Sequence, residues 1–127
     1  MMKNTFYIKL AAVLGGLAVA IGAFGAHGLE ATLVEHGRVD TFETAVKYHF
    51  YHALAILLTG VLVAIRNEKM YRYGANAFFL GIMIFSGSLY TLSLTNMSWL
   101  GAVTPLGGLA FIIGWVLLFI GAGKKSQ

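Results

Sequence analysis

The chain has 127 residues, of which 58% are apolar and only 11% are charged, and its formal net charge is +4. Soluble domains carry about 25% charged residues, so this composition excludes an ordinary water-soluble domain and indicates a membrane protein. There is no cysteine, which excludes disulfides, thiolate metal sites and thiol nucleophiles. No Pro/Ser-rich linker or charged block divides the sequence, so we expect a single domain at residues 1–127.

Four apolar segments follow one another along the chain, and each is close to the about 20 residues that a membrane-spanning helix needs. None shows the period-2 alternation of a barrel strand, and each is about twice as long as one. The sequence therefore predicts an all-α fold, a four-helix transmembrane bundle with spans at residues 6–27, 44–65, 73–95 and 99–122.

The first segment also resembles a signal peptide, because Lys3 and Lys9 precede its apolar run and small residues follow near its end. Small residues recur on it at helical spacing, in the sets Ala12, Gly16, Ala20 and Ala18, Gly22, Ala26. Such residues let helices approach closely in lipid. We therefore expect a permanent span.

The connection between the first two spans, GLEATLVEHGRVDTFET, predicts a short helix resting at the membrane interface. Gly37 would end this helix in a left-handed conformation. Asp40 and Glu43 have the spacing of a capping box, which places the start of the second span near Thr41.

The distribution of basic residues predicts that both termini are cytoplasmic. The side opposite the termini receives only Arg38 and Lys47, diluted by four acidic residues. By the positive-inside rule the richer side faces the cytoplasm. The same bias explains the basic character of the chain, so we expect lipid headgroups and no nucleic acid as partners. Seven of the nine Lys and Arg residues fall on the predicted cytoplasmic side: Lys3, Lys9, Arg66, Lys69, Arg72, Lys124 and Lys125.

Polar residues of the predicted spans gather in the half of the bilayer opposite the termini. Tyr48, His49 and His52 share one face of the second span at 100° per residue. Polar groups inside spans usually face the bundle. We therefore predict one outward-facing polar pocket that binds a ligand, lined by His27, Tyr48, His49, His52, Ser86 and Tyr90.

Three interpretations of these residues remain open. In the first, neutral imidazoles form hydrogen bonds across helices and only stabilise the bundle. In the second, His27, His49 and His52 hold a metal ion, since residues at i and i+3 can share one, although an isolated H-x-x-H is a weak pattern and no carboxylate shares its face. In the third, the pocket binds a small ligand or passes protons, with a histidine as the titrating group.

Glycine and aromatic residues predict how the helices meet each other and the bilayer. In the fourth span Gly107, Gly114 and Gly121 recur every seven residues and predict a close-packed seam. We expect either this seam or three glycines of the first span, Gly15, Gly16 and Gly22, to lie against another helix and not against lipid. Five aromatic residues are expected to anchor the interfaces: Tyr7, Tyr71, Tyr73, Trp99 and Trp115.

Three stretches resemble the signature segments of the domain-of-unknown-function 423 family: GAFGAHGL (22–29), TAVKYHFYHALAILL (44–58) and FSGSLYTLSLTNMSWLGAVTPLGG (85–108). The resemblance covers nearly the whole chain and implies a small four-span membrane protein without an established activity. His27 and His52 match characteristic positions of the family, whereas His49 stands where Gln is more usual. This weakens the metal interpretation, because Gln is a poor metal ligand but a good hydrogen-bonding substitute.

The sequence predicts that the protein is not an enzyme and needs no cofactor, since no nucleophile, base and orienting group can be recognised. We expect a multi-pass protein of the bacterial inner membrane with a structural, assembly or interaction role in the lipid bilayer, as a homo-oligomer or with other membrane proteins. The alternative is a channel or carrier for small molecules, ions or protons. Four short helices leave little room for an enclosed path, so transport would require an oligomer around the histidine-lined pocket.

Overall fold

The computed structural model describes residues 4–125, which are helical almost throughout and contain no strand. The first span is α1 (Phe6–His27), and it is followed by the short α2 (Glu30–His36) and the second span, α3 (Val39–Ile65). All four helices predicted to cross the membrane are present, with the length and hydropathy that a span needs. The all-α, four-span prediction is therefore confirmed.

The third and fourth spans are each built from more than one helical segment. The third joins α4 (Lys69–Gly81), the π-helical segment η1 (Ile82–Ser86) and α5 (Gly87–Thr95) without a break. It begins four residues before the predicted residue 73, and the Glu68 side chain caps its first turn by accepting a hydrogen bond from the Met70 amide at 3.4 Å. The fourth starts with a 3₁₀ segment, η2 (Ser98–Ala102), and continues as α6 (Thr104–Ala122), whose first turn contains the single proline.

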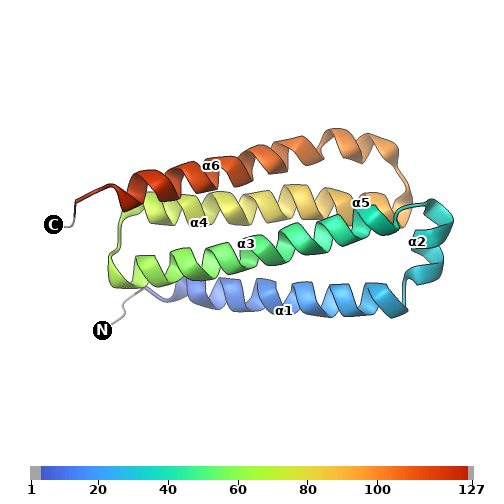
Figure 1. The fold of residues 1–127 in the computed structure, drawn as a ribbon, viewed down its shortest axis with the longest axis horizontal. Helices are drawn as coiled ribbons and strands as arrows, with labels where there is room; N and C mark the ends of the chain where they lie inside the picture. The colour runs from blue at the N-terminus through green and yellow to red at the C-terminus, as the bar shows by residue number, and fades with distance from the viewer. Residues whose placement is uncertain (1–3, 126–127) are drawn as a thin grey trace.

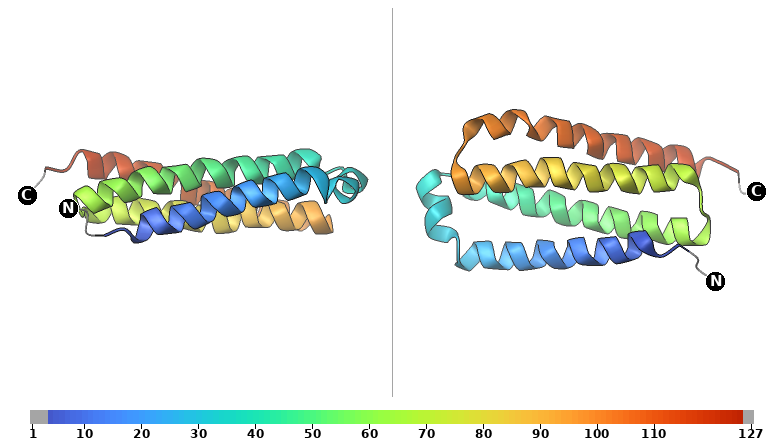
Figure 2. Two further views of the ribbon diagram at one scale, coloured as in Figure 1. Left: turned by 90° about the horizontal axis from the view of Figure 1, so that it is seen from below. Right: turned by 180° about the vertical axis from the view of Figure 1, so that it is seen from behind.

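The four spans form a flattened bundle in which they lie side by side (Figure 1). The helices α3 and α4 are central, α1 packs mainly against α3, and α6 packs mainly against α4 and η1. Two further views show how thin this bundle is across its short direction (Figure 2). Within the most apolar 18 residues of each span, only 22% of the residues are buried in the two edge spans, against 50% in α3 and 39% in the third span. The edge helices therefore leave most of their apolar surface for lipid.

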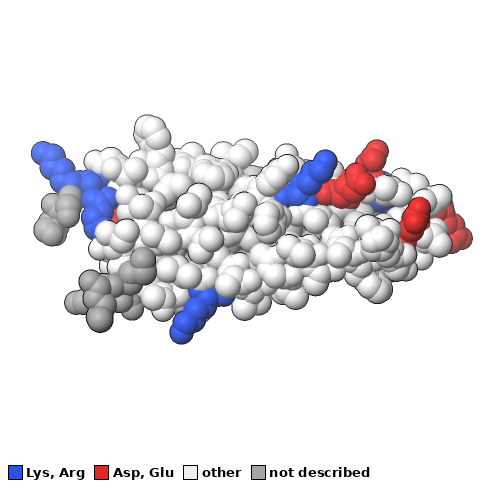
Figure 3. All heavy atoms as spheres, turned by 60° about the horizontal axis from the view of Figure 1, so that its bottom comes forward, with Lys and Arg blue, Asp and Glu red and all other residues white. Residues whose placement is uncertain are grey.

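Both chain ends lie at one end of the bundle and α2 lies at the other (Figure 1), and we call these the terminal end and the α2 end. Acidic side chains gather at the α2 end, and a broad, mostly uncharged band separates them from basic side chains at the terminal end (Figure 3). Five basic residues surround one surface hollow at the terminal end: Arg66, Lys69, Arg72, Lys124 and Lys125. Lys3 lies outside the described residues. This separation is the charge pattern on which the orientation prediction rests.

The connection between the first two spans differs from the prediction at one point. The short helix α2 is present and ends at Gly37, which adopts the left-handed conformation with φ 65°. However, α3 already begins at Val39, so Asp40 lies in its first turn and forms no capping box with Glu43. The left-handed Gly37 turns the chain tightly enough for the Arg38 amide to bond back to the Leu33 carbonyl at 2.9 Å. The next helix can therefore start without a side-chain cap.

The glycine seam of α6 packs against three aromatic residues of the third span: Gly114 and Gly121 meet the rings of Phe78 and Tyr71, and Gly107 meets the backbone and Cβ of Phe85. A Cβ atom added at any of the three glycines would overlap the facing residue, and both rows repeat every seven residues in antiparallel helices. The pairs are Gly107 with Phe85, Gly114 with Phe78 and Gly121 with Tyr71. The predicted close-packed seam is therefore confirmed, and it lies inside the chain.

The glycines of α1 behave differently from one another. A Cβ at Gly22 would lie 3.1 Å from Val46 Cγ1, so this glycine does pack closely against α3. Gly15 comes only within 4.0 Å of Phe50, and nothing lies within 4 Å of Gly16. Gly16 faces away from the rest of the chain because the face of α1 that packs on α3 is marked by Leu14, whose direction differs from that of Gly16 by 200°.

Candidate functional site

The predicted polar residues of α3 lie where this helix packs against the third span, in the half of the bundle toward the α2 end. His49 is only 4% exposed, and its Nδ1 lies 2.8 Å from the hydroxyl oxygen of Tyr90 in α5. Its buried Nε2 makes no hydrogen bond of ordinary geometry, but the Leu14 carbonyl of α1 faces this imidazole. We therefore assign Tyr90 as the donor to Nδ1 and the proton to Nε2, because the other tautomer would set a lone pair against a carbonyl oxygen.

His52 lies one turn further along α3, and partners of opposite kind occupy its two ring nitrogens. Its Nδ1 lies 2.8 Å from the Tyr48 carbonyl of its own helix, which can only accept. Its Nε2 lies 3.3 Å from Nε1 of Trp115, which can only donate. The ring also stacks on Phe111, with centroids 3.6 Å apart and planes 9° apart. This geometry selects a neutral imidazole with its proton on Nδ1, since a second proton would displace the indole N–H.

Ser86 is completely buried and ties the third span to α3 by donating to the Ala45 carbonyl at 2.8 Å. It is the last residue of η1, whose wider turn changes the phase of the helix. Directly before it, Phe85 packs its ring 4.7 Å from that of Tyr48 and lies over Gly107 of α6. The π-helical turn thus lets two neighbouring residues contact different helices: Ser86 contacts α3, and Phe85 contacts Gly107 of α6. Such turns are rare and often occur at functional sites.

The remaining predicted residues lie at the margin of this cluster or outside it. Tyr48 is 39% exposed, with its ring near those of Phe85 and Phe111. His27 is the exposed last residue of α1 and takes part in none of the hydrogen bonds described above. The structure thus brings His49 and Tyr90 into direct contact, and it places His52 and Ser86 on the same side of α3, but it leaves His27 apart. A ligand-binding role for these residues stays a prediction.

No described surface cavity is formed by these histidines. Four of the cavities on the surface of residues 4–125 have volumes of about 270 to 680 Å³, and none of these four is lined by His27, His49 or His52. Tyr90 lines one of them, which is otherwise apolar. Within the same residues no three His, Cys, Asp or Glu side chains gather closely enough to hold a metal ion. The contacts of His49 with Tyr90 and of His52 with Trp115 are of the kind that the first interpretation describes, in which the histidines connect helices.

The sequence did not identify Trp115 as a member of this cluster. It was expected to anchor the membrane interface, as were Tyr7 and Tyr71, but Trp115 bonds His52 and the two tyrosines are buried, at 7% and 5% exposed. The position of Trp115, about halfway along α6, is the signal that could have found it, since an interfacial anchor belongs near a helix end. Trp99, at 61% exposed, and Tyr73, at 50% exposed, do lie on the surface.

Comparison with known proteins extends the resemblance seen in the sequence. The model of the family described as "Protein of unknown function (DUF423)" matches residues 21–108, which include all three quoted stretches. The UPF0382 membrane protein YwdK of Bacillus subtilis (strain 168) is 45% identical over 123 residues, which cover 93% of this chain and 96% of that protein. The UPF0382 inner membrane protein YgdD of Escherichia coli (strain K12) is 42% identical over 130 residues, covering 99% and 95%.

No solved structure matches the chain. The bacterial relatives are named as membrane proteins, and four helices of this chain are long and apolar enough to span a bilayer. The chain is thus a multi-pass protein of the bacterial membrane, and it belongs to the DUF423 family of proteins of unknown function.

Proposed function

We propose that this chain is a non-catalytic structural protein of the membrane that works by lateral association, with a second copy of itself as its first partner. One observation carries the proposal: the four spans lie side by side in a flattened bundle whose edge helices, α1 and α6, bury little of their surface. Helices arranged in this way surround no path through the monomer. They offer two long lateral faces to whatever lies beside them in the bilayer.

The polar groups of the bundle support the same proposal. His49 Nδ1, both ring nitrogens of His52 and the Ser86 hydroxyl form hydrogen bonds to neighbouring helices or to their own backbone. Ser88 likewise contacts Thr104 at 2.6 Å, which links α5 to the start of α6. Groups satisfied in this way hold the helices in register and leave few polar atoms free for a passing solute.

The surface best suited to a second copy is the outward face of α1. Ala12, Gly16 and Ala20 are exposed there at a spacing of four residues, and a Cβ at Gly16 would meet nothing within 4 Å. Small residues at this spacing allow two helix backbones to approach closely, which favours dispersion contacts between spans. The two copies would then meet through the same face of the same helix, as a two-fold dimer requires.

A cysteine cross-linking experiment tests this proposal, and the chain is suited to it because it has no cysteine of its own. The G16C variant, oxidised in isolated membranes, should form a disulfide-linked dimer. The matched control is I113C, since Ile113 is also exposed and lies near the middle of the other edge helix. Cross-linking of G16C no faster than that of I113C, together with a monomeric native mass, would overturn the proposal.

The alternative function is transport of an ion, a proton or a small molecule by an oligomer. One observation favours it: His49 Nε2 and Thr59 Oγ1 are buried polar atoms on α3 that lack a hydrogen-bond partner among the described residues. Buried polar groups are usually paired, so both atoms are candidates for contact with water or an ion. They lie ten residues apart, however, and Ile56 and Ala53 between them are fully or almost fully buried.

A further inference from the structure

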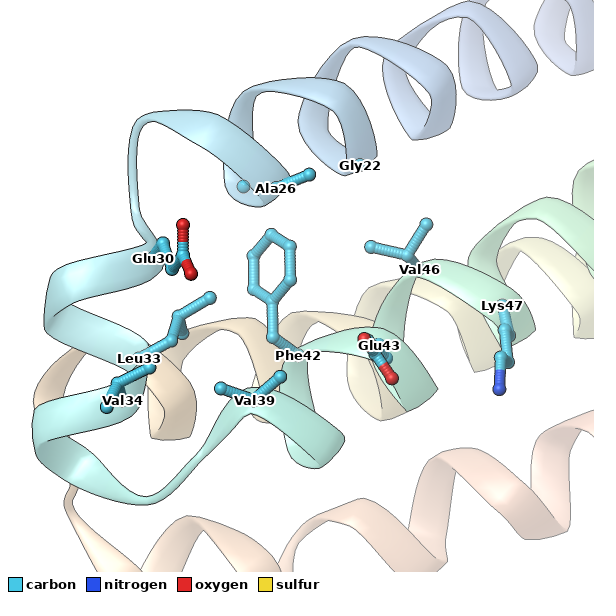
Figure 4. Close-up of a pocket in the computed structure, with 11 residues that line it drawn as sticks. Gly22, Ala26, Glu30, Leu33, Val34, Val39, Phe42, Glu43, Val46 and Lys47 are labelled. Atoms are coloured by element: carbon cyan, nitrogen blue, oxygen red, sulfur yellow. The ribbon is translucent and has the colours of Figure 1, made fainter.

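A groove runs along the surface of the bundle between α1 and α3. At the α2 end it widens into a cavity of about 530 Å³ between α1, α2 and the start of α3 (Figure 4). Toward the middle of the bundle it continues as a second cavity of about 270 Å³. The two cavities share Gly22, Val46 and Lys47 in their linings, so they form one continuous groove.

Small residues on α1 produce this groove. Gly22, Gly25 and Ala26 line its wider part, and Ala18 lines its inner part. Gly22 lies opposite Val46, next to Lys47, and from Ala18 to Gly22 the helix rises about 6 Å at 1.5 Å per residue. This length is less than half of the about 15 Å of hydrocarbon in one leaflet. The part of the groove between Lys47 and the middle of the bundle therefore has room for the first part of one lipid acyl chain.

Three charged side chains line the groove, and they occur in a definite order. Lys47 lines both cavities, Glu43 lies one helical turn closer to the α2 end, and Glu30 lies across the opening at the start of α2 (Figure 4). All three side chains belong to exposed residues. Going outward along the groove, the inner part is therefore apolar, a cationic group follows, and two anionic groups follow among the apolar residues of the wider cavity.

We propose that this groove binds a phospholipid with a primary ammonium headgroup, of the phosphatidylethanolamine type. Such a lipid has the complementary order: an acyl chain, then an anionic phosphate, then a terminal ammonium. Lys47 matches the phosphate, and the carboxylates of Glu30 and Glu43 accept hydrogen bonds from the ammonium, which has three N–H donors. The acyl chain lies along the groove between α1 and α3.

The charge at the α2 end selects among lipids. From residue 28 to residue 47 the chain carries four acidic and two basic side chains, so a lipid with net negative charge is disfavoured there. A choline headgroup keeps the positive charge but has no N–H to donate, so the two carboxylates distinguish it from ethanolamine. This binding is separate from the association of two chains through Gly16, which lines neither cavity.

Native mass spectrometry of the detergent-solubilised protein tests this proposal directly. The protein is mixed with equal amounts of phosphatidylethanolamine, phosphatidylcholine and phosphatidylglycerol that carry the same acyl chains. We expect the ethanolamine lipid to be retained several-fold more than either of the others. In the double variant E30Q/E43Q this several-fold advantage over the choline lipid should disappear, because the charged acceptors of the ammonium N–H groups are lost.

Three matched controls separate this result from loss of folding or a general change of charge. E35Q removes an exposed carboxylate of α2 that does not line the groove, so it should retain the wild-type preference. A26L should reduce retention of all three lipids, whereas A23L, on another exposed face of α1, should not. Equal retention of the ethanolamine and choline lipids by the wild type, or the same behaviour of E30Q/E43Q and E35Q, would overturn the proposal.

Discussion

At the scale of single residues, the most informative contact is the one between His52 and Trp115. A carbonyl and an indole N–H on opposite sides of the ring require one tautomer, and stacking on Phe111 holds the plane of that ring. The indole N–H would otherwise be a donor without a partner in an apolar part of the bundle. The hydrogen bond between His52 and Trp115 therefore connects α3 to α6 in one fixed orientation.

A double-mutant cycle measures this contact. H52F keeps the aromatic stacking and removes both ring nitrogens, and W115F removes the donor. We expect a coupling free energy of about 0.5–1.5 kcal/mol in unfolding experiments in detergent, the range for hydrogen bonds inside a membrane. The cycle of H52F with W99F is the control, because Trp99 is 61% exposed in η2 and has no such contact with His52. Equal coupling energies in the two cycles would show that the hydrogen bond between His52 and Trp115 has no energetic role.

At the scale of the helices, close packing of α4 and η1 on α6 depends on an aromatic residue of the third span meeting a glycine of α6 every seven residues. This arrangement brings the two helices together closely enough for a Cβ at Gly74 to lie 3.2 Å from the Gly114 carbonyl oxygen. Dispersion contacts are the main attraction between helices in lipid, since lipid tails are as apolar as the side chains they replace. The seam is therefore a main source of cohesion between these two helices.

Substitution of Gly114 by alanine tests the seam with the smallest possible change. The added methyl group would overlap the Phe78 ring, so G114A should destabilise the protein by about 1–3 kcal/mol, the usual cost of overpacking. G87A is the matched control, because Gly87 is helical and a Cβ there would meet nothing within 4 Å. We expect G87A to be neutral or slightly stabilising in a thermal melt monitored by loss of helix. The reverse order of the two melting temperatures would contradict the packing.

The sequence predicted the elements better than it predicted their contacts. Four spans followed from hydropathy, and the depth of His49, Ser86 and Tyr90 followed from counting along them. His27 is exposed at the end of α1 and takes no part in the hydrogen bonds of His49 and His52, because depth in the bilayer says nothing about the direction of a side chain at a helix end. The role of Trp115 also required the three-dimensional arrangement, since His52 lies 63 residues away from it in the chain.

The phase change at η1 was equally hidden from the sequence. No proline or polar break marks Ile82–Ser86, and a regular α-helix was the simplest expectation for residues 73–95. The wider π-helical turn is stabilised by two tertiary contacts. The Ser86 hydroxyl donates a hydrogen bond to the Ala45 carbonyl, and Phe85 packs against Gly107. Periodicity read along one helix does not contain these contacts, because their partners belong to two other helices.

At the scale of the whole molecule, the orientation in the membrane decides which leaflet each end meets. The predicted orientation places the terminal end in the cytoplasm, so K69C should resist a membrane-impermeant thiol reagent added to intact cells, whereas E35C in α2 should react. Both positions are exposed, so accessibility within the fold does not limit either reaction. Labelling of K69C and not of E35C would invert the orientation and move the lipid groove to the cytoplasmic leaflet.

The central claim is that the protein works through its lateral surface and not through a path across it. The most direct test is a flux measurement on vesicles that contain the purified protein, with a pH-sensitive dye inside and an imposed proton or potassium gradient. Flux should equal that of protein-free vesicles, and H49Q should leave it unchanged, because His49 is bonded to Tyr90 inside the bundle. Flux well above that of empty vesicles, lost in H49Q, would contradict the account and establish the protein as a transporter.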